Sequence, residues 1–98
     1  DRLYSTQILF VNFGEKEAEA CLDYTARLRA SGIRAELYPE TGKLKKQMGY
    51  ADAKKIPFVA LVGEDEISSG KITVKDMSAG TQEQLSIEEI VARLKPGI

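Results

Sequence analysis

The chain has no histidine and only one cysteine among its 98 residues. Without histidine, His-based catalytic triads, imidazole general bases and most zinc sites are excluded together. With Cys21 alone, neither an internal disulfide nor a C-x-x-C redox motif can form, and such sparse cysteine suits a cytoplasmic protein. Cys21 falls on the apolar face of an expected helix, which favours a core position over a reactive thiol.

The sequence also lacks long apolar runs and an excess of charge of one sign. No run approaches the roughly 20 apolar residues of a membrane span, so no membrane contact is expected, and no signal-peptide pattern opens the chain. The net charge of −1 argues against a surface that coats nucleic acid broadly, but it leaves room for a local site. Because the first residue is Asp1 and not Met, we expect a fragment of a longer chain, with one domain over residues 1–98.

Glycine-rich phosphate-binding loops are missing as well. Residues 12–16, which follow the first expected strand, include one glycine, whereas a dinucleotide fingerprint or P-loop needs several. That strand also ends without the aspartates with which a phospho-acceptor receiver domain holds magnesium. We therefore expect no catalytic residue, no metal site and no cofactor in this chain.

Three short apolar runs alternate with helical patterns in the first two thirds of the chain. Residues 8–13 and 58–62 are nearly continuous apolar runs, as in buried parallel strands, and residues 34–38 form a shorter strand between them. Two amphipathic helices are expected in the intervening segments, the second with Leu44, Met48 and Ala51 on its apolar face. This order predicts a β-α-β-α-β unit with right-handed crossovers.

The pattern changes after residue 63. Residues 71–75 alternate polar and apolar side chains, and residues 81–85 return after a turn, which predicts an antiparallel hairpin. Ser86 and Glu89 form a capping box that opens a last helix. The predicted fold is α/β, a three-layer α/β/α arrangement with a five-stranded mixed sheet and three helices.

An acidic segment and a lysine-bearing strand surround one expected turn after the third strand. Glu66 lies in this turn and Lys75 on the strand that leaves it, so the two can converge at the carboxyl edge of the sheet, where α/β proteins bind ligands. A carboxylate accepts hydrogen bonds from the Watson–Crick edge of guanine, and a lysine donates to base carbonyls or phosphate, as in recognition of unpaired RNA bases. The alternative is a solvated acidic loop with a surface lysine.

Three short motifs contain these residues and a lysine cluster. They are KLKKQ at residues 43–47, GEDE at 63–66, and VKDM at 74–77, which is followed by Gly80 and Gln82. The lysines of the first motif alone would be read as a solvated helix face. Together the motifs resemble the C-terminal anticodon-binding domain of class IIa aminoacyl-tRNA synthetases, above all that of the histidine enzymes. The resemblance runs from Ile8 to near Leu94.

The resemblance implies binding of the histidine tRNA anticodon stem-loop. Histidine activation with ATP and magnesium would then occur in a catalytic domain of the same chain, absent here, and the full protein would be a homodimer. By similarity, anticodon bases would contact Glu66, Lys75 and Glu64, and the RNA backbone would contact Lys43, Lys45, Lys46 and Gln47. Lys75 stands where the threonine enzymes have arginine, so bidentate base recognition is not implied at this position.

Two other hypotheses remain open. The same fold can serve as a regulatory or protein-interaction module of a synthetase-like protein that does not charge tRNA. Alternatively, the chain is a small-molecule-binding α/β domain with its ligand at the carboxyl edge of the sheet.

Overall fold

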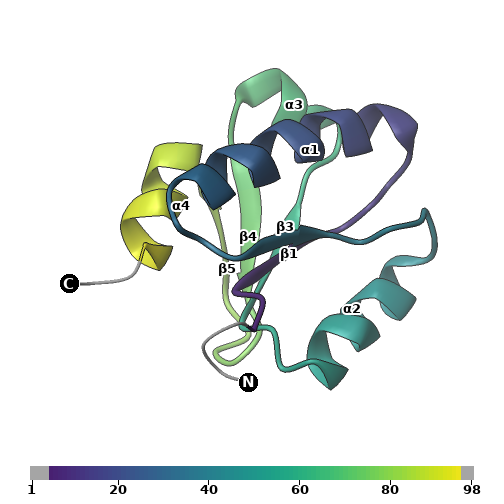
Figure 1. Ribbon diagram of the computed structural model, residues 1–98. Helices are drawn as coiled ribbons and strands as arrows, with labels where there is room; N and C mark the ends of the chain where they lie inside the picture. Colours follow the sequence, from purple (N-terminus) through teal and green to yellow (C-terminus); the bar gives the residue numbers. More distant parts are fainter. Residues whose placement is uncertain (1–4, 96–98) are drawn as a thin grey trace.

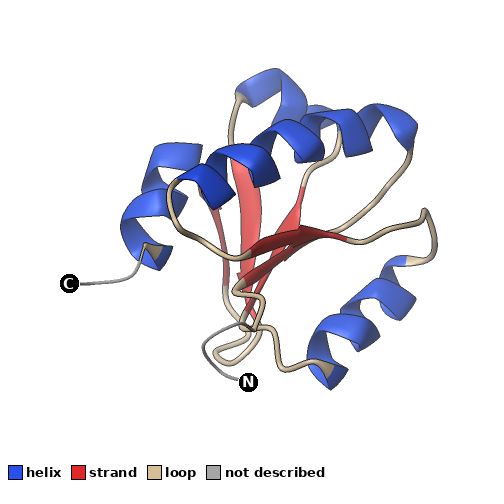
Figure 2. Ribbon diagram, in the orientation of Figure 1, coloured by secondary structure: helices blue, strands red, loops and turns tan. Residues whose placement is uncertain are grey.

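The computed structural model describes residues 5–95 of the chain. The elements in chain order are β1 (Ile8–Phe10), α1 (Glu15–Ala30), β2 (Ala35–Leu37), α2 (Leu44–Ala53), β3 (Phe58–Leu61), α3 (Glu64–Ser69), β4 (Ile72–Asp76), β5 (Gln82–Leu85) and α4 (Ile87–Leu94). Figure 1 labels them and Figure 2 distinguishes strands from helices. Among the described residues, no helix is long and apolar enough to cross a membrane.

The five strands form one mixed sheet in the order β2-β1-β3-β4-β5. Strand β1 pairs in parallel with both β2 and β3, which gives the predicted β-α-β-α-β unit. Strand β4 pairs antiparallel with β3, and β5 pairs antiparallel with β4, as the predicted hairpin requires. The fold class read from the sequence is therefore confirmed.

Helices cover both faces of the sheet, so the molecule has three layers (Figure 1). On one face, α1 and α4 pack on a core that includes Ile8, Phe10 and Ile72. On the other face, α2 covers a smaller core that includes Leu9 and Val59. Burial of β1 on both faces explains why its residues are nearly all apolar.

Two details differ from the sequence prediction. Strand β1 ends at Phe10, earlier than predicted, because the main chain of Asn12 bonds to the side chain of Gln47 and not to a neighbouring strand. The acidic segment is the short helix α3, where a turn was predicted. It ends at Gly70, whose φ of 75° is the left-handed conformation that glycine adopts without strain.

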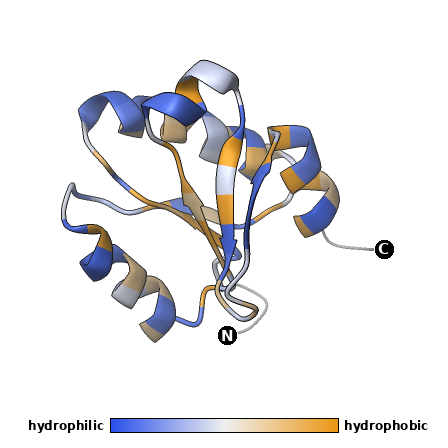
Figure 3. Ribbon diagram, turned by 180° about the vertical axis from the view of Figure 1, so that it is seen from behind, coloured by the Kyte–Doolittle hydropathy of each residue, from blue (hydrophilic) through white to orange (hydrophobic). Residues whose placement is uncertain are grey.

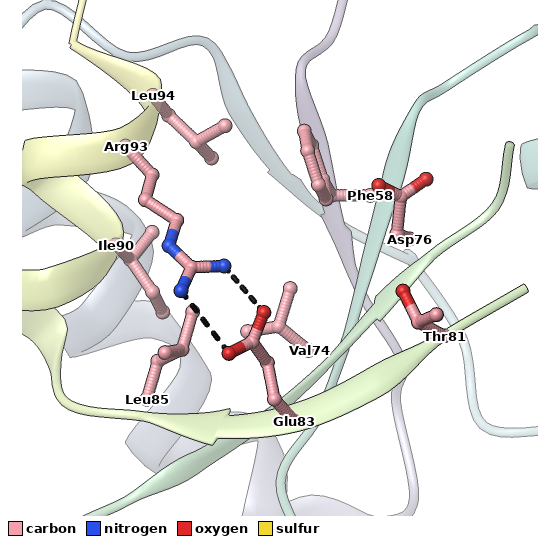
Figure 4. A pocket seen from close by; sticks show the side chains of 9 residues that line it. All are labelled: Phe58, Val74, Asp76, Thr81, Glu83, Leu85, Ile90, Arg93 and Leu94. Carbon is pink, nitrogen blue, oxygen red and sulfur yellow. Dashed lines mark hydrogen bonds and ion pairs between the residues drawn. The ribbon is translucent and has the colours of Figure 1, made fainter. Parts of the chain in front are cut away.

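The predicted capping box of α4 is confirmed. The Glu89 main-chain N–H donates to Ser86 Oγ at 3.1 Å, and the Ser86 N–H donates to Glu89 Oε1 at 2.8 Å. Arg93 on α4 also forms a two-point ion pair with Glu83 on β5, at the rim of a cavity of about 40 Å³ (Figure 4). These contacts fix α4 against the β4–β5 side of the sheet.

Candidate nucleic-acid interface

Helix α3 holds the Glu66 carboxylate at the carboxyl end of β3. The Gly63 N–H donates to Glu66 Oε1 at 2.8 Å, and Thr73 Oγ1 donates to Glu66 Oε2 at 2.9 Å. The hydrogen bond from Gly63 is the main cause that lowers the pKa of Glu66 below its ordinary value, and the Thr73 bond acts in the same direction. Glu66 is thus an ionised acceptor, held in place by a helix start and by strand β4.

Lys75 lies on the same face of the sheet as Thr73, the partner of Glu66. Side chains two residues apart on a strand share a face, with Cα atoms about 7 Å apart. Strand β5 continues this face, because Thr73 is paired with Gln84 and Lys75 with Gln82. Lys75 is half-buried, and its side chain makes no hydrogen bond or ion pair with the described residues.

This part of the sheet is not covered by a helix. We call Thr73, Lys75, Gln82 and Gln84 the open sheet face, in which Thr73 is the one buried residue. It lies on the same side of the sheet as α2, which packs over β1, β2 and β3. Figure 3 shows β4 and β5 from this side, with α2 beside them and not in front. Gln82 and Gln84 are exposed, so amide groups that donate and accept hydrogen bonds flank the lysine.

Glu64 and Asp65 occupy the first turn of α3 and point their charge into solvent. Both are exposed, and neither has a partner among the described residues. Carboxylates at this end of a helix are stabilised by the helix dipole. Lys75 is paired with Val59, two residues before the end of β3, so its convergence with Glu66 at one rim stays a prediction. Glu64 is an exposed carboxylate two residues before Glu66.

The three lysines of the KLKKQ motif are all exposed. Lys43 is the N-cap residue of α2, without a side-chain cap bond, and Lys45 and Lys46 lie in the first turn, which has no acidic residue. Lys46 Nζ lies 3.5 Å from Glu40 Oε1 in a surface ion pair. A surface ion pair contributes little to the free energy of folding, so all three lysine side chains can turn toward an anionic partner.

Gln47 does not belong to this surface. It is 0% exposed, and its amide accepts from the Asn12 N–H at 2.7 Å and donates to the Asn12 carbonyl at 2.9 Å and the Gly42 carbonyl at 3.1 Å. The predicted contact of Gln47 with the RNA backbone does not fit this burial. Its spacing to buried Ala51, one helical turn on, was the signal for a core position.

Asn12 is the residue that the motifs missed. Its buried side-chain amide donates to the Tyr38 carbonyl at 3.1 Å and accepts from the Gly14 N–H at 3.1 Å. With Gln47 it joins the loop after β1 to the loop after β2 and the start of α2. The two loops at the carboxyl ends of these strands are therefore held as one unit.

The described residues offer no alternative chemistry at this edge. Cys21 is fully buried, and burial together with the nearby Glu17 raises the pKa of its thiol to about 12, so it is not a nucleophile. No group of three or more Cys, Asp or Glu side chains within residues 5–95 is placed to hold a metal ion.

Residues 7–96 match the family described as "Anticodon binding domain". The chain belongs to this family, and the resemblance read from its short motifs is confirmed. It is 52% identical to the histidine–tRNA ligase of Phocaeicola vulgatus over 90 residues, which is 92% of this chain and 20% of the relative. The corresponding ligase of Bacteroides fragilis is 51% identical over 91% of this chain and 20% of the relative.

Solved structures agree with the family. The histidyl-tRNA synthetase from Nostoc sp. PCC 7120 superposes with a TM-score of 0.84 and 26% identity, over 90% of this chain and 21% of that chain. The apo Staphylococcus aureus histidyl-tRNA synthetase superposes with a TM-score of 0.83 and 27% sequence identity, over 98% of this chain and 25% of that chain. The chain thus spans about a fifth of the length of the curated relatives that it matches.

Proposed function

We propose that the chain is the part of a histidine–tRNA ligase that recognises the anticodon loop of histidine tRNA. The observation that carries the proposal is that Glu66 is bonded to Thr73 on the same side of the sheet as Lys75, Gln82 and Gln84, which no helix covers. The chain is 52% identical to a histidine–tRNA ligase, which supports histidine as the amino acid that the full protein attaches to tRNA.

The chemistry of this face suits unpaired bases. A carboxylate offers about four acceptor sites, and the internal hydrogen bonds of Glu66 use two of them. The remaining sites can accept from the imino and amino groups of guanine, since the lowered pKa keeps Glu66 charged. Lys75 donates to a base carbonyl or a phosphate, and Glu64 is a second acceptor at the rim.

Contacts with the RNA backbone are assigned to the start of α2. Lys43, Lys45 and Lys46 are exposed point charges that neutralise phosphates without reading sequence. The open sheet face and Glu66 would then select the anticodon bases, and the lysines of α2 would supply affinity for the RNA backbone.

The rest of such a protein would perform the reaction. A catalytic domain outside this chain would activate histidine with ATP and magnesium, and the full ligase would act as a homodimer in the cytoplasm. Nothing in this domain would bind the nucleotide.

Substitution of Lys75 tests the proposal. We expect Lys75→Ala to weaken binding of the histidine anticodon stem-loop about tenfold, with less loss for a stem-loop whose first anticodon guanine is replaced. Fluorescence anisotropy titrations measure both constants. Lys54→Ala is the matched control, because Lys54 is an exposed lysine near the other end of α2. Equal loss in both variants would count against a base-reading role.

A further inference from the structure

Two large apolar side chains are exposed close to the KLKKQ lysines. Phe13, in the loop between β1 and α1, is 44% exposed, and Leu44, in the first turn of α2, is 43% exposed. Leu22, on α1, is the other large apolar residue exposed among residues 5–95. Of these three, only Phe13 carries an aromatic ring, which can stack on another planar group.

One buried side chain joins the positions of these two residues. Gln47 bonds both main-chain groups of Asn12, the neighbour of Phe13, and also the carbonyl of Gly42, two residues before Leu44. Phe13 and Leu44 therefore project from backbone segments that the same amide holds together.

The loop that carries Phe13 is also fixed from its other side. The Asn12 side chain bonds the Tyr38 carbonyl and the Gly14 N–H, and the Gly14 carbonyl accepts from the Ala18 N–H at 2.8 Å. Residues on both sides of Phe13 are thus anchored by buried or helical hydrogen bonds. The aromatic ring is presented by a rigid support, as a preorganised binding group requires.

The surrounding charge indicates the occupant. Lys43, Lys45 and Lys46 stand at the start of α2, where Glu40 is paired with Lys46. On the α1 side of Phe13, Lys16 lies between Glu15 and Glu17, so the excess of cations is on the α2 side. An exposed aromatic beside cations is the combination with which proteins bind single-stranded nucleic acid, the ring stacking on a base and the cations holding phosphates. An acidic protein segment would match the charge but would have no specific use for an aromatic ring.

We propose that Phe13, supported by Leu44, is a stacking platform for one unpaired base of the anticodon loop, whose adjoining phosphates contact Lys43 and Lys45. The proposal rests on the proposed function for the identity of the RNA. The stacking platform does not include residues of the open sheet face. Loss of stacking should weaken binding whatever the base, whereas loss of Glu66 or Lys75 should reduce discrimination between bases.

The test compares Phe13→Leu and Phe13→Trp in the chain. Leucine keeps an apolar side chain but removes the ring, so binding of the stem-loop should weaken about tenfold for native and guanine-replaced loops alike. Tryptophan keeps a stacking surface and should retain wild-type affinity. Leu22→Ala is the control, because Leu22 is an even more exposed apolar residue on α1, and the variant should bind as the wild type does.

A second readout reports stacking itself. The stem-loop carries 2-aminopurine at one loop position at a time, and we expect one position to lose fluorescence on binding wild type and Phe13→Trp but not Phe13→Leu. Unchanged melting temperatures exclude unfolding as the cause of weaker binding. The proposal is overturned if Phe13→Leu binds as tightly as wild type while Lys75→Ala still loses base discrimination, which leaves the proposed function intact. Absence of any stem-loop binding by wild type would overturn both.

Discussion

At the scale of single residues, Glu66 combines two tasks in one carboxylate. It closes the first turn of α3 through the Gly63 N–H and ties that helix to β4 through Thr73. Since the same group is proposed to read a base, its loss would disturb both structure and recognition. Lys75, whose side chain has no hydrogen-bond or ion-pair partner among the described residues, is therefore the cleaner probe of recognition.

The lowered pKa of Glu66 predicts a pH-dependent contribution to stability. A carboxyl whose folded pKa lies below its ordinary value of 4.5 stabilises the fold above that pH, and the contribution is lost as the pH falls through the folded value. Glu66→Gln should thus lower the free energy of unfolding by about 1 kcal/mol at pH 7, with a smaller difference toward pH 3. Urea unfolding of the wild type and of Glu66→Gln between pH 3 and pH 7 measures this difference in the free energy of unfolding.

The control for this experiment is Asp65→Asn. Asp65 is a neighbouring exposed carboxylate in the first turn of the same helix, without a hydrogen-bond partner among the described residues. A pH-dependent loss of equal size in both variants would show that helix-end charge, and not the hydrogen bonds of Glu66, stabilises α3.

At the scale of elements, the junction of the β1–α1 loop with α2 depends on Gln47. Gln47→Ala would leave both main-chain groups of buried Asn12 without partners and would remove the bond to the exposed Gly42. We expect the free energy of unfolding to fall by about 3 kcal/mol, measured by urea denaturation. Lys45→Ala, on the exposed side of the same helix, should change it by less than about 0.5 kcal/mol. Similar small effects in both variants would contradict the assigned role.

The same element shows where sequence patterns were insufficient. The apolar face of α2 was predicted from Leu44, Met48 and Ala51, yet Leu44 is exposed and Gln47 is buried in its place. Hydropathy ranks glutamine as a surface residue, and two of its three hydrogen bonds go to Asn12, which is 35 residues away in sequence. Helix α3 was missed for another reason: its six residues are too few to show a period.

At the scale of the whole molecule, the topology was predictable and most of the site was not. Buried runs at β1 and β3, the alternation in β4 and the capping box of α4 each specify an element locally, and their order allows few topologies. The strand order also put Glu66 and Lys75 on neighbouring elements, whereas their convergence at one rim stays a prediction. The roles of Thr73, Asn12 and Phe13 depend on register and on contacts between loops, which no local pattern encodes.

The account as a whole requires that this chain distinguishes anticodon sequences, and one titration tests that requirement directly. The chain is titrated with the histidine tRNA anticodon stem-loop and with the same stem-loop whose first anticodon guanine is replaced, each at two salt concentrations. The account predicts tighter binding of the native loop, by roughly tenfold, at both salts, with both affinities falling as salt rises. Equal affinities for the two loops would contradict it and would leave only nonspecific attraction to the lysines.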